Sequence, residues 1–126
     1  MDESVGLSIV IPVFNSSQTI GCLVRDLGSL KISGGLEIIL VNDGSTDNSQ
    51  QVCEELARTS LVPVTVIEHT KNYGEHNAVM SGFRLVNGRY VITMDDDFQN
   101  PPDEIPRLYE SIQKQDKDVI YCDYNV

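Results

Sequence analysis

Short apolar runs alternate along this chain with segments whose apolar residues recur at helical spacing. The runs are rich in Val, Ile and Leu, and they predict five buried strands, at 7–13, 36–41, 64–67, 90–94 and 118–121. Apolar residues three and four positions apart predict helices between them, around 20–30, 52–57, 78–86 and 105–112. Asn87-Gly88 is expected to end the third helix. The alternation predicts an α/β fold, with a mostly parallel sheet in a three-layer α/β/α sandwich.

Polar loops follow the first four predicted strands. They are 14–17, 42–47, 71–77 and 95–100, and three of them carry carboxylates. Ligands of parallel α/β sheets bind beyond the carboxyl ends of the strands, where such loops meet. We therefore expect the four loops to form one polar pocket.

The acidic triplet Asp95-Asp96-Asp97 directly follows the fourth predicted strand. If the chain stays extended, alternate side chains point the same way, so Asp95, Asp97 and Gln99 face one side and Asp96 the other. Two carboxylates and an amide oxygen are hard ligands that suit Mg²⁺ or Mn²⁺ with positions left open for phosphates. The alternative is a solvated acidic turn that caps the next helix.

Three residues at or near the ends of the first two predicted strands suit a nucleotide. Asp43 follows the second strand, where its carboxylate could accept hydrogen bonds from a ribose or a base edge, or could simply belong to an Asp43-Gly44 turn. Pro12 has no N–H and is expected to mark where strand pairing ends. Phe14 could stack on a base or pack in the core. His69 and His76 lack metal-ligand spacing and are interpreted as loop residues.

Composition limits the class of protein. A length of 126 residues suits one domain, and 9 basic against 19 acidic residues give a formal net charge of −10, which disfavours nucleic acid as a partner. No apolar run is long enough to cross a membrane, and the first residues lack the layout of a signal peptide, so a cytoplasmic protein is expected. Glycine-rich dinucleotide and P-loop motifs are absent from the sequence.

Several ordered motifs resemble one enzyme family. The segments 8–15 and 39–47, Asn72-Tyr73-Gly74 and the D-x-D triplet resemble the inverting family-two glycosyltransferases, which have the GT-A fold. The segment 94–102 is similar to the polyprenyl-phosphate branch, which resembles dolichol-phosphate mannosyltransferase. The resemblance implies that residues 1–126 are the nucleotide-sugar-binding N-terminal part of a truncated GT-A domain, with no second domain.

The resemblance also implies roles for single residues. Pro12, Phe14 and Asp43 would line the base and ribose site, and Asp96 would approach the ribose or the diphosphate. Asn72 and Gly74 of the third loop belong with these nucleotide-sugar-binding residues. Asp95, Asp97 and Gln99 would hold the metal. The chain departs from the family's pattern twice: Ser16 stands where the family often has an acid, and Asp96 stands where the middle D-x-D residue is often small.

The implied reaction transfers a sugar, with inversion, from a nucleoside diphosphate sugar to a polyprenyl phosphate or a glycan, as in cell wall or polysaccharide biosynthesis. The catalytic base is expected beyond Val126, in a longer form that associates with the inner face of the membrane. Self-association through an uncovered sheet edge is a further expectation. The alternatives are a non-catalytic nucleotide-sugar-binding module, an inactive fragment and, less favoured because 14–17 is not glycine-rich, a sugar nucleotidyltransferase.

Overall fold

A computed structural model describes residues 5–96, 101–115 and 119–121 of the chain. Strands and helices alternate, as the apolar pattern predicts. In chain order they are β1 (Leu7–Val13), α1 (Ile20–Gly28), β2 (Leu36–Asn42), α2 (Ser49–Thr59), β3 (Val64–Glu68), α3 (Glu75–Phe83), β4 (Tyr90–Thr93), a short 3₁₀ turn (Pro102–Glu104), α4 (Ile105–Gln115) and β5 (Val119–Tyr121).

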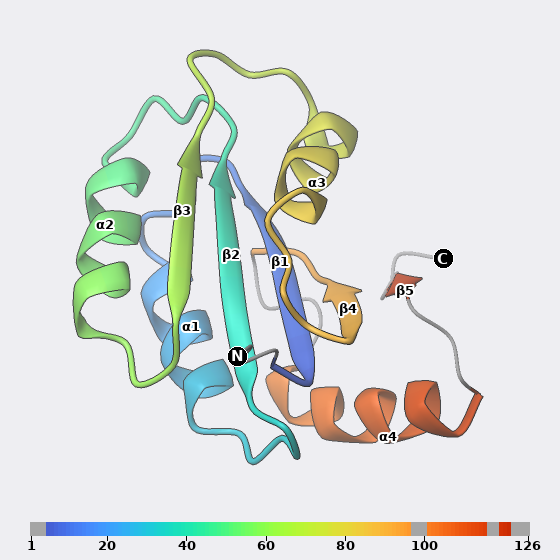
Figure 1. Cartoon of the computed structure of the whole chain (residues 1–126). Coiled ribbons are helices and arrows are strands. Elements are labelled where there is room, and N and C mark those ends of the chain that lie inside the picture. The colour runs from blue at the N-terminus through green and yellow to red at the C-terminus, as the bar shows by residue number, and fades with distance from the viewer. Residues whose placement is uncertain (1–4, 97–100, 116–118, 122–126) are drawn as a thin grey trace.

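The five strands form one sheet in the order β3-β2-β1-β4-β5, and every neighbouring pair is parallel. β1 lies at the centre, where Ile9 pairs with Ile38 of β2 on one side and Ile92 of β4 on the other. Because all strands run the same way, the loops that follow them leave the sheet at one edge (Figure 1).

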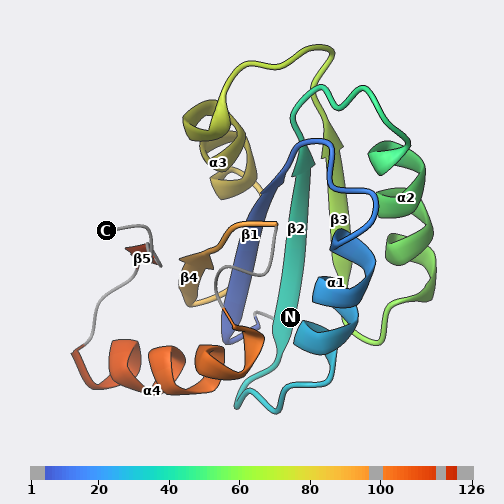
Figure 2. The ribbon, with the colours of Figure 1, turned by 180° about the vertical axis from the view of Figure 1, so that it is seen from behind.

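Helices cover both faces of the sheet, so the predicted three-layer arrangement is confirmed (Figures 1 and 2). Alternate residues of β1 separate the two apolar cores. Ile9 and Ile11 belong to the larger core, which includes buried side chains of α1, α2 and α4. Val10 belongs to the smaller core, which Ala78 of α3 completes. Both faces of the central strands are therefore buried, which is why these strands read as continuous apolar runs.

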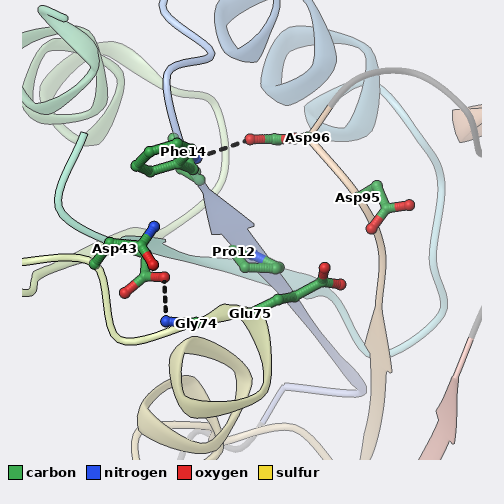
Figure 3. A pocket seen from close by; sticks show the side chains of 9 residues that line it. Pro12, Phe14, Asp43, Gly74, Glu75, Asp95 and Asp96 are labelled. Atoms are coloured by element: carbon green, nitrogen blue, oxygen red, sulfur yellow. Dashed lines mark hydrogen bonds between the residues drawn. The ribbon is translucent and has the colours of Figure 1, made fainter. Parts of the chain in front are cut away.

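Helix α3 packs closely against the sheet at Gly82. A β-carbon added at Gly82 would come within 2.5 Å of Cγ1 of Val10, so only glycine fits there without a shift. At the other end of the helix, Glu75, the first residue of α3, lies beside Pro12 near the carboxyl end of β1 (Figure 3).

The prediction for the end of this helix was wrong. Helix α3 ends at Phe83, not near Asn87, and its last turn tightens through hydrogen bonds such as Leu85 N–H to the carbonyl of Gly82 at 3.0 Å. The reason is a buried polar cluster at the opposite edge of the sheet. Glu37 of β2 accepts hydrogen bonds from the Asn87 N–H at 2.6 Å and from the Ser8 hydroxyl at 2.5 Å. Asn87 is thus held by the sheet and cannot continue the helix.

Within the described ranges, no helix is both long enough and apolar enough to span a membrane.

Candidate functional site

The four loops predicted to carry the chemistry surround one cavity at the carboxyl edge of the sheet. Its volume is about 240 Å³ (Figure 3). All six residues assigned to nucleotide-sugar binding line it, together with three others: Pro12, Val13, Phe14, Asp43, Asn72, Gly74, Glu75, Asp95 and Asp96. Figure 3 shows Phe14 and Asp43 towards one end, Asp95 towards the other, and Pro12 and Glu75 between them.

Asp43 joins the second loop to the third. Asp43 is only 3% exposed, and its carboxylate accepts hydrogen bonds from the backbone N–H groups of Tyr73 and Gly74, each at 2.9 Å. Oδ1 also lies 2.9 Å from Nδ1 of His69. Burial raises the pKa of the Asp43 carboxyl, but the hydrogen bonds from Tyr73, His69 and Gly74 lower it more, so this pKa lies below its ordinary value of 3.8. Asp43 is therefore ionised at neutral pH.

His69 has a positioning role that its spacing in the sequence does not indicate. One ring nitrogen contacts Asp43, and the other, Nε2, lies 2.8 Å from the Ser81 hydroxyl on α3. The imidazole thus connects β2 to α3 beneath the third loop. His76 is exposed and is not among the lining residues. No local pattern marks His69, because its partners are 26 and 12 positions away.

Gly44 lets the second and third loops touch. Its φ is +72°, and a β-carbon there would lie 2.3 Å from the carbonyl carbon of Lys71 and 2.4 Å from the amide nitrogen of Asn72. An L-residue is disfavoured both by this backbone angle and by the contact. The two predictions for this loop, a turn and a place at the ligand, are therefore compatible. Gly44 shapes the turn, and Asp43 lines the cavity.

The first loop is tied to the second through Asn15. This residue has a left-handed φ of 50°, which asparagine tolerates better than most residues. Its N–H donates to the Ser45 hydroxyl at 2.9 Å, and its side-chain oxygen accepts the Thr46 N–H at 2.8 Å. The adjacent Phe14 ring is 45% exposed, so of the two predicted roles the structure favours a ring at the cavity over a core position.

The first two carboxylates of the triplet diverge, as strand alternation predicts. The Asp96 carboxylate turns to the first loop and accepts the Phe14 N–H at 3.0 Å, whereas Asp95 lies across the cavity (Figure 3). The other two predicted metal ligands, Asp97 and Gln99, lie outside the described residues.

Glu75 and Val13 line the cavity although sequence reasoning did not select them. Glu75 is the first residue of α3 and follows Gly74, so its position after a motif glycine was the available signal. Among the described residues that line this cavity there is no Lys or Arg, while four carry carboxylates. Such a lining attracts cations and repels a bare phosphate.

A family model for glycosyl transferase family 2 matches residues 8–126. The chain belongs to this family. The prediction from the ordered motifs is thereby confirmed.

Relatives in the family carry names that specify a lipid phosphate. The chain is 41% identical, over 116 residues, to an undecaprenyl-phosphate 4-deoxy-4-formamido-L-arabinose transferase of Pseudomonas savastanoi pv. phaseolicola, a match that covers 90% of the chain and 34% of the relative. It is 45% identical, over 106 residues, to the protein of the same name from Pseudomonas fluorescens, covering 82% and 31%. The chain spans about a third of the length of these relatives, and the predicted likeness to the polyprenyl-phosphate branch of the family is confirmed.

Solved structures share the fold at lower identity. The mannosyltransferase PcManGT from Pyrobaculum calidifontis, in complex with GDP-Man and Mn²⁺, superposes with a TM-score of 0.74 at 20% identity, covering 88% of this chain and 34% of that one. S. aureus TarS 1-349, in complex with UDP-GlcNAc, gives a TM-score of 0.69 at 19% identity, covering 87% and 32%. These likenesses confirm the predicted GT-A fold.

Proposed function

We propose that this chain is the donor-binding part of a metal-dependent glycosyltransferase, which transfers a sugar with inversion from a nucleoside diphosphate sugar to a polyprenyl phosphate. The observation that carries the proposal is the cavity at the carboxyl edge, with an exposed aromatic ring towards one end and Asp95 towards the other. The groups of a nucleoside diphosphate follow a matching order, with an aromatic base at one end and phosphates at the other.

The base and ribose would lie at the Phe14 end. A half-exposed aromatic ring offers a stacking surface for a base. Asp43 would face the ribose only with the lone pairs that Tyr73, Gly74 and His69 leave over, so its main contribution is to hold the third loop against the cavity. Pro12 and the backbone around Asn72 and Gly74 would form the floor and one wall.

The diphosphate would lie at the Asp95 end and would need a divalent cation. The described lining supplies no basic side chain to neutralise the phosphates, and Asp43 adds a fixed negative charge. Asp95, Asp97 and Gln99 are hard oxygen ligands that fit Mg²⁺ or Mn²⁺, and Asp95 stands where the phosphates would pass. When bound, the cation would neutralise the negative charge that grows on the leaving nucleoside diphosphate.

The acceptor is inferred from the relatives' names. Undecaprenyl phosphate, the lipid in those names, carries an oxygen nucleophile that is already ionised, so its transfer needs little help from a base. A glycan acceptor would need a carboxylate base, which we place beyond Val126. A lipid acceptor would bring the longer protein to the inner face of the membrane.

Calorimetry of UDP and GDP, each with and without Mn²⁺, tests the donor site. We expect one nucleotide to bind measurably in Mn²⁺ and neither to bind measurably without it. Asp97→Ala should abolish the metal-dependent binding. Absence of any metal-dependent binding would refute both the transferase proposal and the alternative of a non-catalytic binding module, and turnover by the longer protein separates these two.

Self-association through the β5 side of the sheet stays a prediction. β5 is an outer strand in the described sheet. A monomeric mass in light scattering at high concentration would contradict it.

A further inference from the structure

The side chain of Asp96 is held by the first loop, and its backbone is held by Thr19, the residue before α1. Its carboxylate oxygen Oδ2 accepts the Phe14 N–H at 3.0 Å and also the hydroxyl of Ser16. Its backbone carbonyl accepts the Thr19 hydroxyl at 2.9 Å. These partners are about 80 positions away, so the contacts join the two loops that flank the cavity.

The contacts fix groups on both sides of the cavity. On one side, the Phe14 N–H is the amide of the residue whose ring faces the cavity, so its bond to Asp96 restrains the backbone beneath that ring. On the other side, the anchored residue is the one that directly follows Asp95 in the chain, so its contacts limit how far the backbone at Asp95 can move. Asp95 lines the opposite end of the cavity.

We propose that Asp96 is a positioning residue that aligns the base end of the donor site with its metal end. Its carboxylate points to the first loop, where its Oδ2 atom is already engaged by two donors, so it acts through the loop that carries Phe14 and through its neighbour Asp95. The alignment of ring and metal rests on the proposed function, whereas the restraint on the Phe14 amide does not.

The side-chain partner of Asp96 is Ser16. Ser16 is buried, and its Oγ atom, which donates to Asp96, also lies 3.0 Å from the Phe14 carbonyl oxygen. Residues 14–17 contain no acid of their own. Asp96 supplies the carboxylate from the neighbouring loop. Ser16 and Asp96 are thus in direct contact, so we expect a carboxylate at either position to compensate for its absence at the other.

The compensation can be tested by moving the carboxylate from one loop to the other. A glutamate at position 16 is two bonds longer than serine, so in an Asp96→Ala background its carboxylate can occupy the vacated space. Four proteins are compared: wild type, Asp96→Ala, Ser16→Glu and the double variant. Two quantities are measured: hydrogen exchange of the Phe14 amide by NMR, and affinity for UDP and GDP in Mn²⁺.

We expect Asp96→Ala to speed exchange of the Phe14 amide and to weaken nucleotide affinity by about tenfold, as for loss of a hydrogen bond to a charged acceptor. Exchange at the Ile39 amide in β2 should not change, which separates local loosening from global loss of stability. Ser16→Glu alone places two carboxylates together and should also weaken binding, whereas the double variant should recover most of the affinity.

Unchanged hydrogen exchange of the Phe14 amide in Asp96→Ala would overturn the proposal. It would also be overturned if the loss of nucleotide affinity in the double variant equalled the sum of the losses, in free energy, of the two single variants. If wild type binds neither nucleotide, the proposed function fails, while the exchange measurement still decides whether Asp96 restrains the first loop.

Discussion

Asp43 and Gly74 lie 31 positions apart in the sequence, yet Oδ2 of Asp43 accepts the Gly74 N–H at 2.9 Å. This bond joins the end of β2 to the start of α3, and Gly74 has a φ of +101° that sets the entry into the helix. The shape of the third loop is therefore determined by a carboxylate from the second loop.

Replacing that carboxylate should destabilise the protein in a pH-dependent way. At about pH 7 we expect Asp43→Asn to lower the free energy of unfolding by about 1–3 kcal/mol, because a buried charged acceptor is lost. The pKa of the Asp43 carboxyl is lowered in the folded state. Its contribution to the stability of the protein is therefore present above pH 3.8, the ordinary pKa of the group, and is lost as the pH falls through the folded-state pKa.

The measurement is urea unfolding of wild type and Asp43→Asn from about pH 7 down to about pH 3. The difference in unfolding free energy between wild type and Asp43→Asn should become smaller towards the acidic end of this range. Asp26→Asn, on the exposed face of α1, is the matched control and should show no such gap. A gap for Asp43→Asn that stays constant across this range would contradict the assignment.

A pair of glycine variants tests how closely the second and third loops approach. Gly44 and Gly35 both have positive φ, at +72° and +91°, but a β-carbon meets backbone within 2.4 Å at Gly44 and nothing within 4 Å at Gly35. Gly35→Ala should cost about 1–2 kcal/mol from the backbone angle alone. Gly44→Ala should cost about 1–3 kcal/mol more, because loop backbone must move. Equal costs in chemical denaturation would mean that the loops do not touch.

Phe14→Ala tests the base end of the cavity. Loss of a stacked base typically costs about 1–3 kcal/mol, so nucleotide affinity in Mn²⁺ should fall by about 5- to 160-fold, with little change in thermal stability since the ring is half-exposed. Leu61→Ala changes an apolar residue that is 87% exposed and does not line the cavity, and it should leave affinity unchanged. Titration calorimetry measures both variants, and equal affinities would place the base elsewhere.

Asp95→Ala tests the phosphate end. We expect nucleotide affinity in Mn²⁺ to fall at least about tenfold, towards the value measured without metal, because a hard anionic ligand is lost. Asp26→Asn removes one negative charge outside the cavity lining and controls for net charge. If Asp95→Ala retains full metal-dependent affinity, the cation is held by other residues.

The strands and the location of the site could be predicted because their signals are local. Apolar runs mark strands buried on both faces. The rule that ligands bind at the carboxyl ends of parallel strands predicted one shared pocket, and Pro12, Phe14, Asp43 and Asp95 do line one cavity. The end of α3 and the role of His69 could not be predicted in this way. Each depends on a partner that is distant in sequence, Glu37 for Asn87 and Asp43 for His69.

The clamping of α3 bears on the thermodynamics of recognition. Asp43 holds Gly74, the residue before the helix, and Glu37 holds Asn87, beyond the end of the helix. Between them, Gly82 lets the helix pack directly on Val10 of β1. One wall of the cavity therefore gives up its conformational freedom during folding, before any donor arrives. When a ligand docks against this wall, the wall itself loses little further conformational entropy. More of the binding free energy is then left to orient the metal and the sugar on the opposite side of the cavity.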